Sequence, residues 1–241
     1  MHTGSIKNVG FVSTRIAGTD GVSLEIKKWA EVLERNLFNC FYFAGEIDRN
    51  AAVSFKIDEA HFEHPDIDSI NNDVFGTTKR SRKTSNDIQK IKDKLKSALY
   101  DFCKRFNIDV IIPENALTIS MNLPLGIAIT EFIIETGIPA IAHHHDFYWE
   151  RTRFSVNAAG DYLRMAFPPN LNNIEHVVIN SAAKEELALR TGISSTIIPN
   201  VLDFENPPEV DEDKTIAFRD SLELGPQDRI ILQPTRIIQR K

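Results

Sequence analysis

Residues 109–145 read DVIIPENALTISMNLPLGIAITEFIIETGIPAIAHHH, and this stretch decides the fold. Residues 109–113 are a short apolar run that predicts a buried strand, and residues 138–145 predict a second one. Between them, residues 125–136 have the length and apolar content of a helix. A strand, a crossover helix and a second strand place the two strands parallel in one sheet.

The same alternation extends over the rest of the chain. Apolar stripes at spacings of three and four predict helices, and short apolar runs predict strands. The other predicted strands are 7–13, 38–44, 176–180, 194–198 and 229–233, and the other predicted helices are 22–37, 88–106, 182–191 and 216–222. We therefore expect an α/β fold, a Rossmann-like, doubly wound parallel sheet with helices on both faces.

Two segments between these elements lack a clear period. Residues 46–75 predict short or irregular elements, and the basic tract 79–83 predicts a mobile loop. Ser85, Asn86 and Asp87 are candidate N-caps for the helix that follows.

Composition excludes several classes of protein. The 241 residues are 42% hydrophobic and 26% charged, which is ordinary for a globular chain. A net charge of −6 makes the chain a poor general binder of nucleic acid or anionic membrane. Its two cysteines form no disulfide framework, and no signal peptide or continuous apolar span is apparent. We expect a cytoplasmic protein without an integral membrane segment.

The chain is expected to contain one domain and the start of another. Residues 1–204 contain the full alternation of strands and helices, and 205–214 are rich in proline and acidic residues, as in a linker. Residues 215–241 would then begin a second, truncated domain.

The turns that follow the strands are the places where a doubly wound sheet binds ligands. The first is Ala-Gly-Thr-Asp-Gly-Val-Ser at 17–23, in which Gly18 and Gly21 allow a close approach of the backbone. A phosphate would suit the following helix N-terminus. The alternative is a tight turn with Asp20 as a helix cap.

The second turn is Ile-Ala-His-His-His-Asp at 141–146. On a strand His144 points away from His143 and His145, so the three cannot bind one ion from regular geometry. We therefore expect no metal and no cofactor. His143 and His144 also fit histidines that are merely hydrogen-bonded at a sheet edge.

Three later segments complete a series. Residues 178–187 place Ser181 as a helix cap after a strand, and Ile-Pro-Asn-Val-Leu-Asp at 198–203 contains Asn200 and Asp203. Residues 232–241 place Arg236 five residues before Lys241.

In order and spacing, these five segments resemble glycosyltransferase family 4, whose members have the GT-B architecture. The resemblance covers nearly the whole chain. It departs from the family at Asp20, where a glycine is usual, and at Val201 and Leu202, where Gly-Val is usual. The resemblance implies catalytic roles for His145, Arg236 and Lys241, donor-phosphate contacts from Gly18, Asp20, Gly21, Arg236 and Lys241, and cleft positions for Asn200 and Asp203.

Further polar residues after the strands are candidates for binding an acceptor. They face the expected crevice, and the arginine would suit a phosphorylated or carboxylated acceptor. These residues are Glu114, Asn115, Asp146, Tyr148 and Arg151. The alternative for 147–149 is the apolar start of a helix that packs inward.

The resemblance implies a hexosyltransferase that moves a sugar from a nucleoside diphosphate sugar to an acceptor hydroxyl. It implies retention of configuration without a metal, since cations and backbone amides stabilise the departing diphosphate. His145 would hold the donor sugar or a phosphate oxygen. The 241 residues alone are expected to be inactive, because the family's paired donor-site glutamates are absent.

Three other functions stay open. One is another GT-B enzyme, such as a sugar-nucleotide epimerase or a phosphorylase. A second is a non-catalytic, flavodoxin-like binding or regulatory domain. A third is nucleic-acid binding through 79–83, which the acidic net charge disfavours.

Overall fold

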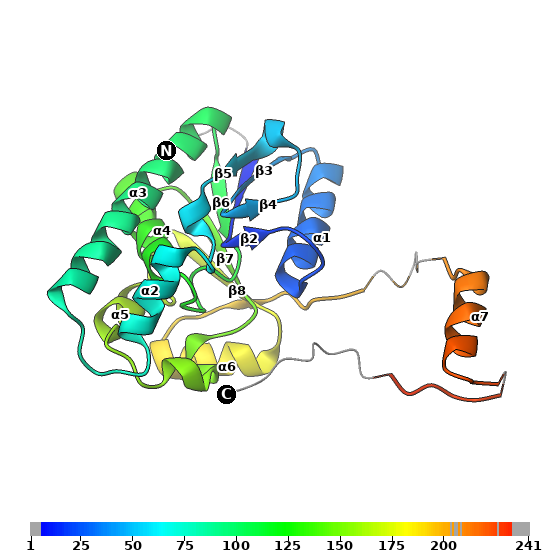
Figure 1. Cartoon of the computed structure of the whole chain (residues 1–241). Helices are drawn as coiled ribbons and strands as arrows, with labels where there is room; N and C mark the ends of the chain where they lie inside the picture. The colour runs from blue at the N-terminus through cyan, green and yellow to red at the C-terminus, as the bar shows by residue number, and fades with distance from the viewer. Residues whose placement is uncertain (1–5, 203, 205–206, 208, 226, 233–241) are drawn as a thin grey trace. The chain divides into compact units, whose positions relative to one another are not determined.

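The computed structural model describes residues 6–202, 204, 207, 209–225 and 227–232. Its centre is a seven-stranded sheet in the order β5-β3-β1-β6-β7-β8-β9, with every neighbouring pair parallel (Figure 1). These strands are β1 (Asn8–Val12), β3 (Asn39–Ala44), β5 (Ser54–Lys56), β6 (Val110–Pro113), β7 (Ala140–His144), β8 (Ile174–Val178) and β9 (Thr196–Ile197). The expected fold class is confirmed.

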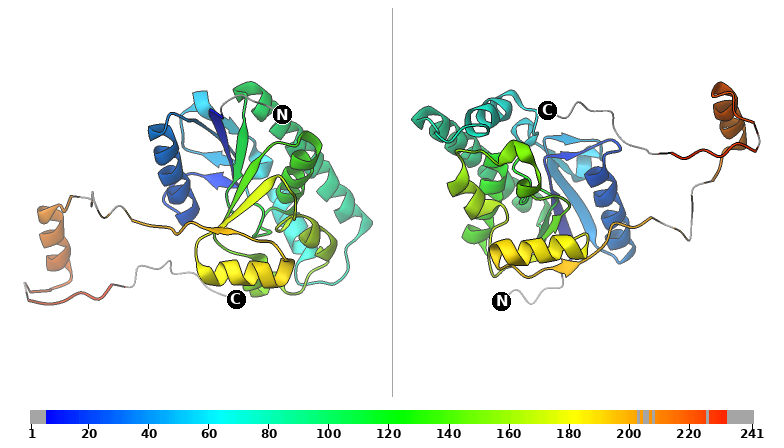
Figure 2. Two further views of the ribbon diagram at one scale, coloured as in Figure 1. Left: turned by 180° about the vertical axis from the view of Figure 1, so that it is seen from behind. Right: turned by 90° about the horizontal axis from the view of Figure 1, so that it is seen from below.

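Helices cover both faces of this sheet (Figure 2). They are α1 (Gly21–Arg35), α2 (Pro65–Val74), α3 (Arg82–Phe106), α4 (Leu123–Thr136), α5 (Gly160–Ala166) and α6 (Ser181–Thr191). Helix α1 packs in one apolar cluster, and α2 to α5 pack in another. In β6, Val110 and Ile112 belong to the first cluster and Ile111 to the second. The strand is therefore buried on both faces, as parallel sheets require.

The strand order reverses between β1 and β6. From β1 the chain passes through α1 to β3 on one side, whereas β6 pairs with β1 on the other. Val12 and Pro113 are register partners, so Ser13 and Glu114 follow side by side, and the Ser13 hydroxyl donates to the Glu114 carbonyl at 3.0 Å. In doubly wound sheets the crevice at this reversal is where ligands bind.

The region 46–75, expected to contain short elements or irregular loops, contains short elements and one ten-residue helix. A small parallel ladder pairs β2 (Arg15–Ile16) with β4 (Glu46–Ile47), and short 3-10 turns follow at η1 (Ala51–Val53) and η2 (Asp58–Ala60). Helix α2 begins with Pro65, and the His64 ring accepts from the Asp66 amide. Its few apolar side chains gave a weak pattern, although the structure buries all of them.

Two expected helix starts are wrong. Helix α3 begins at Arg82 with Ser81 as its cap, so Ser85, Asn86 and Asp87 lie inside it and the tract 79–83 is partly helical. Helix α6 is capped by Asn180, which accepts from the Ala183 amide at 2.8 Å, and Ser181 is its first residue. In both cases a polar side chain one or more residues earlier reaches the free amides first.

The chain divides into two compact units, Met1–Asn200 and Val201–Lys241. The second contains α7 (Glu212–Ser221), close to the helix expected at 216–222. Residues 229–232 form no strand, which corrects the expected strand 229–233, and Gln233 lies outside the described residues. The described helices include none that is long and apolar enough to cross a membrane.

Candidate functional site

A carboxylate and two imidazoles meet where the strand order reverses. Glu114 is the first residue after β6, and it forms an isolated parallel bridge with His143 near the end of β7. Asn115 follows in the left-handed region, with φ 55°. Its amide donates to the His143 carbonyl at 2.8 Å, which ties the two strand ends together.

Glu114 is fully buried and ionised. Its two oxygens lie 3.2 and 3.0 Å from His143 Nδ1. Burial alone would raise the pKa of this carboxyl, but the contacts with His143 and His145 hold it below its usual range. A buried carboxylate that favours its ionised form therefore lies under the crevice, with imidazole nitrogens as its neighbours.

His143 is held rigidly beside that carboxylate. Its side chain is fully buried, and its ring stacks on Trp29 of α1 with centroids 4.6 Å apart. The sequence predicts a helix at 22–37, which contains Trp29, but no local pattern predicts its stacking on His143. His143 is thus fixed from below by Glu114 and across its face by an indole ring.

His145 is the more accessible imidazole of the pair. Two residues beyond His143, it faces the same side, and its side chain is 10% exposed. Its Nε2 lies 3.5 Å from a Glu114 oxygen, and its Nδ1 lies 3.3 Å from Asn200 Nδ2. The Asn115 side-chain oxygen also accepts from the His145 and Asp146 amides. The structure therefore brings together four predicted residues around His145.

The opposite face of β7 carries a different pair. His144 Nε2 lies 2.8 Å from His176 Nδ1, and both rings are buried. Burial lowers the pKa of His176 to about 4 and holds the pKa of His144 well below its usual range, with the neighbouring imidazoles adding to the effect. His176 was not predicted, although its position on the adjacent strand in register with Ala142 places it beside β7.

A metal could in principle use part of this cluster. One ligand atom each from Glu114, His143 and His145 lie within 4.8 Å of one another. The expectation that His144 could not join the other two histidines agrees with its place on the other face. The contribution of Glu114 from the neighbouring strand was not foreseen, since it requires the pairing of β6 with β7.

The expected acceptor-binding residues have several partners of their own. Glu114 faces His143, with no exposed side-chain surface. Asp146 and Arg151 form an ion pair at 2.6 Å, and both are partly exposed. Tyr148 begins the 3-10 turn η3 (Tyr148–Glu150), which is followed by η4 (Thr152–Phe154). Residues 147–149 pack inward in part, because Phe147 is buried and stacks on Trp149.

The expected phosphate loop is closed by local contacts. The Asp20 carboxylate accepts from the Val22 and Ser23 amides at 3.1 Å, so it caps α1 as the alternative interpretation proposed. The Gly18 amide donates to Asp48 at 2.8 Å. A Cβ built on Gly21 would meet no atom within 4 Å. A phosphate at this helix end would compete with Asp20 for the same amides.

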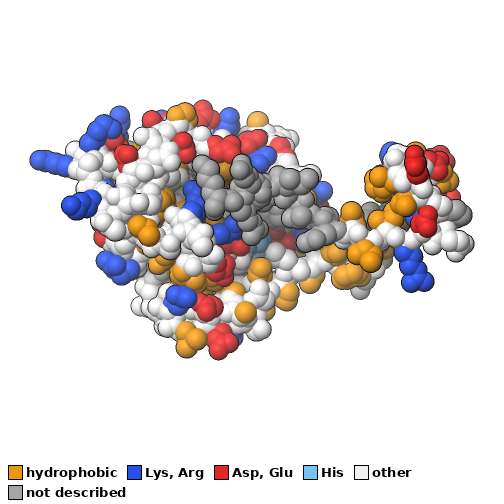
Figure 3. Space-filling model, turned by 60° about the horizontal axis from the view of Figure 1, so that its bottom comes forward, with side chains coloured by type: hydrophobic (Ala, Val, Ile, Leu, Met, Phe, Trp, Pro, Cys, Tyr) orange, Lys and Arg blue, Asp and Glu red, His pale blue; other side chains and the backbone are white. Residues whose placement is uncertain are grey.

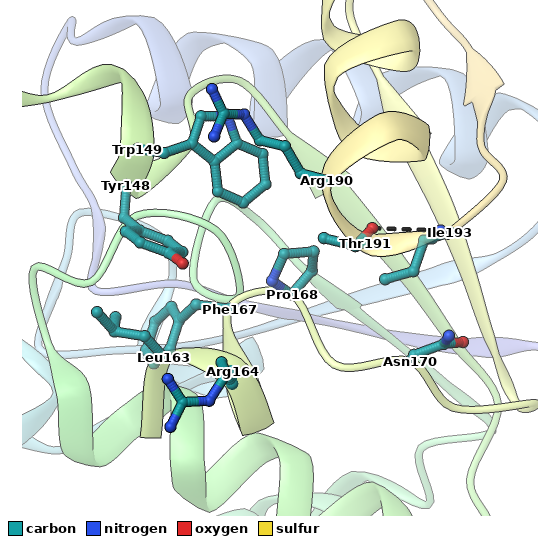
Figure 4. A pocket seen from close by; sticks show the side chains of 10 residues that line it. All are labelled: Tyr148, Trp149, Leu163, Arg164, Phe167, Pro168, Asn170, Arg190, Thr191 and Ile193. Atoms are coloured by element: carbon teal, nitrogen blue, oxygen red, sulfur yellow. Dashed lines mark hydrogen bonds between the residues drawn. The ribbon is translucent and has the colours of Figure 1, made fainter. Parts of the chain in front are cut away.

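A separate pocket lies between α5, α6 and η3 (Figure 4). It has a volume of about 530 Å³. Aromatic rings and two arginines line it, among them Tyr148, Trp149, Arg164 and Arg190. The Arg190 guanidinium lies over the Trp149 ring, 5.4 Å from its centroid. Of the predicted site residues that the structure describes, only Tyr148 borders this pocket.

Three predicted residues cannot be placed. Asp203, Arg236 and Lys241 lie outside the described residues.

Among the residues drawn in colour in Figure 3, acidic and basic side chains are intermixed over the face shown.

The chain has relatives among known proteins. No family model matches it. It is 34% identical over 239 residues to a mannosylglucosylglycerate synthase of Petrotoga mobilis, covering 97% of this chain and 54% of that protein. It is 35% identical over 231 residues to a protein of the same name from Thermotoga maritima, covering 92% and 51%. Both relatives are glycosyltransferases.

The chain spans about half the length of these relatives. A solved structure supports the fold independently. A sucrose-phosphate synthase from Thermosynechococcus elongatus superposes with a TM-score of 0.54 at 12% identity, over 92% of this chain and 53% of that one. At this identity the likeness shows the fold alone.

Proposed function

We propose that this chain is the acceptor-side half of a GT-B glycosyltransferase that resembles family 4. The observation that carries the proposal is the 34% identity along 97% of the chain to a mannosylglucosylglycerate synthase. The location of Glu114, His143 and His145 at the strand-order reversal supports it, since ligands bind at such a place. The second unit, from Val201, would begin the donor-binding domain.

The names of the relatives narrow the proposed reaction. In mannosylglucosylglycerate the mannosyl group is outermost, so its attachment to glucosylglycerate is the bond we propose this enzyme forms. The donor would be a nucleoside diphosphate mannose. Glucosylglycerate carries a carboxylate, and we propose that Arg151, which pairs with Asp146 next to His145 in the chain, meets such an acceptor.

We propose that transfer proceeds with retention and without a metal or other cofactor. Imidazole nitrogens of His143 and His145 face the Glu114 carboxylate, which supports a site in which the carboxylate has polar partners without an ion. His145 would hold a ligand group, and Arg236 and Lys241 would stabilise the departing diphosphate. We still propose that the backbone at Gly21, at the start of α1, lies close to the donor.

The test is a transfer assay with protein expressed from the complete gene. Mannose linked to different nucleoside diphosphates is offered together with glucosylglycerate, and the product is examined by NMR. We expect a product with the anomeric configuration of the donor, formed equally well in the presence of a chelator. Inverted product or loss of activity with chelator would refute those parts, and no transfer from any nucleotide sugar would refute the function.

A further inference from the structure

One buried carboxylate lies between two imidazoles, and its hydrogen-bonding needs determine where their protons are. The Glu114 side chain has no exposed surface. Burying such a charge is costly unless N–H groups point at it. Each imidazole beside Glu114 is therefore expected to direct a protonated nitrogen toward the carboxylate.

His143 meets this need without being able to touch a ligand. Its Nδ1 lies 3.0 Å from the nearer Glu114 oxygen, and its ring is buried under Trp29. His143 therefore anchors the carboxylate in place. The direction of the Glu114 side chain is then fixed before any substrate arrives.

The two ring nitrogens of His145 face different residues, Asn200 and Glu114. Both neighbours favour the tautomer with its proton on Nε2. The Asn200 side-chain nitrogen is a donor, so His145 Nδ1, 3.3 Å away, must accept. In a neutral imidazole the proton then lies on Nε2. That is the nitrogen that faces Glu114 at 3.5 Å. At this distance His145 Nε2 is buried and makes no hydrogen bond within the described residues, and contacts of this kind often shorten only when substrate binds.

We propose that Glu114 is a positioning residue, which holds His145 with its proton on Nε2 and so presents an unprotonated Nδ1 to the crevice. The proposal relies on the proposed function only for the nature of the ligand. A ligand that displaces Asn200 finds an acceptor at Nδ1. A sugar hydroxyl can donate to it, whereas a fully ionised phosphate cannot. Of the two groups expected to contact His145, a donor sugar and a phosphate oxygen, His145 therefore favours the sugar, through one of its hydroxyls.

A bound metal would require the opposite proton positions. An ion held by Glu114, His143 and His145 needs both facing nitrogens unprotonated, whereas the hydrogen bonds need them protonated. The two arrangements exclude each other. A direct observation of the protons therefore separates them.

The first experiment reads the protons by ¹⁵N NMR on the complete protein labelled at histidine. We expect His145 to show a protonated Nε2 and a bare Nδ1 in the wild type. In Glu114→Gln the single side-chain oxygen stays with His143, so His145 should become a mixture of both forms. The control His144→Gln, on the other face of the same strand, should leave the His145 signals in place.

The second experiment is a double-mutant cycle on transfer activity. We expect Glu114→Gln to lower kcat/KM by roughly tenfold, the effect of one lost hydrogen bond. In a His145→Asn background the same change should cost nothing more, because Glu114 acts through His145. Glu114→Asp, which keeps the charge, should recover part of the loss. Additive losses would overturn the positioning role.

The experiments still test the proposal if one of the variants is unstable. If Glu114→Gln fails to fold, the wild-type NMR signals and Glu114→Asp still decide. A wild-type His145 protonated on Nδ1 alone, or a tightly bound metal lost with Glu114, overturns the proposal. A complete protein with no transferase activity refutes the proposed function, while the NMR result on Glu114 stands.

Discussion

The two faces of strand β7 place imidazoles in different surroundings. On one face His143 and His145 share the buried carboxylate of Glu114. On the other face His144 and His176 contact each other, and the nearby Glu175 carboxylate raises the pKa of His176 less than burial lowers it. The first face contains a buried carboxylate whose pKa is held down by its imidazole neighbours, whereas the second face disfavours an added positive charge, since burial lowers the pKa values of His144 and His176. Alternation along one strand thus separates a charged site from a neutral core pair.

The largest expected effects on stability come from truncating one histidine on each face of β7. His143→Ala leaves the buried Glu114 carboxylate without its closest donor, so we expect about 3–5 kcal/mol less stability. His144→Ala leaves only the neutral His176 ring unpaired, and about 1–3 kcal/mol is expected. The free energy of unfolding in urea measures both. Since the same side chain is truncated on the same strand, equal losses would contradict the contrast.

The second effect is a dependence of stability on pH that belongs to the neutral face. In the unfolded chain His176 takes up a proton near pH 6.5, whereas in the folded protein its pKa is about 4. The unfolded state therefore binds more protons between these values, and stability falls as the pH falls through this window. We expect a loss of roughly 2–3 kcal/mol from pH 7 to 4.

His176→Gln should remove much of that slope, which urea unfolding at a series of pH values would reveal. Glu114 acts in a lower range. The pKa of Glu114 in the folded protein is below its usual value. Its contribution to stability is therefore complete above the usual carboxyl pKa and is lost only as the pH falls through the lower, folded pKa. An unchanged slope between pH 6.5 and 4 in His176→Gln would show that other groups cause it.

A smaller effect distinguishes the tryptophans that lie on the two faces. Trp29 stacks on His143, and Trp149 stacks on Phe147, whose ring also contacts His144. Trp29→Leu and Trp149→Leu should each cost about 1 kcal/mol of stacking energy beyond the area lost. Only Trp29→Leu should also lower transfer activity, because it loosens the ring that anchors Glu114. Equal activities in the two variants would argue against that anchor.

The sequence predicted the sheet well because parallel strands bury both faces and give continuous apolar runs, as in 109–113. It failed at α2, whose helical face has few apolar residues, and at the cap of α3, where Ser81 and Ser85 were equally suitable by type. It named His145 and Glu114 as separate candidates. Their contact depends on the pairing of β6 with β7 and on the turn at Asn115, which no local pattern contains.

The smallest expected effects on stability come from two arginine substitutions, which also test where the acceptor binds. Arg151 pairs with the partly exposed Asp146 beside His145, and Arg190 pairs with the exposed Glu186 beside the aromatic pocket. Exposed ion pairs contribute little, so Arg151→Gln and Arg190→Gln should each cost less than about 1 kcal/mol of stability. Any difference between them in activity therefore reports on ligand contacts.

If the acceptor carboxylate meets Arg151, as proposed, then Arg151→Gln should raise the KM for the acceptor by about tenfold and leave the KM for the donor unchanged. Arg190→Gln should change neither. The reverse result would move the acceptor to the pocket of about 530 Å³ between α5, α6 and η3. Steady-state kinetics of both variants, with each substrate varied in turn, would then assign the charged acceptor to one of the two regions, because both arginines lose the same charge at a similar exposure.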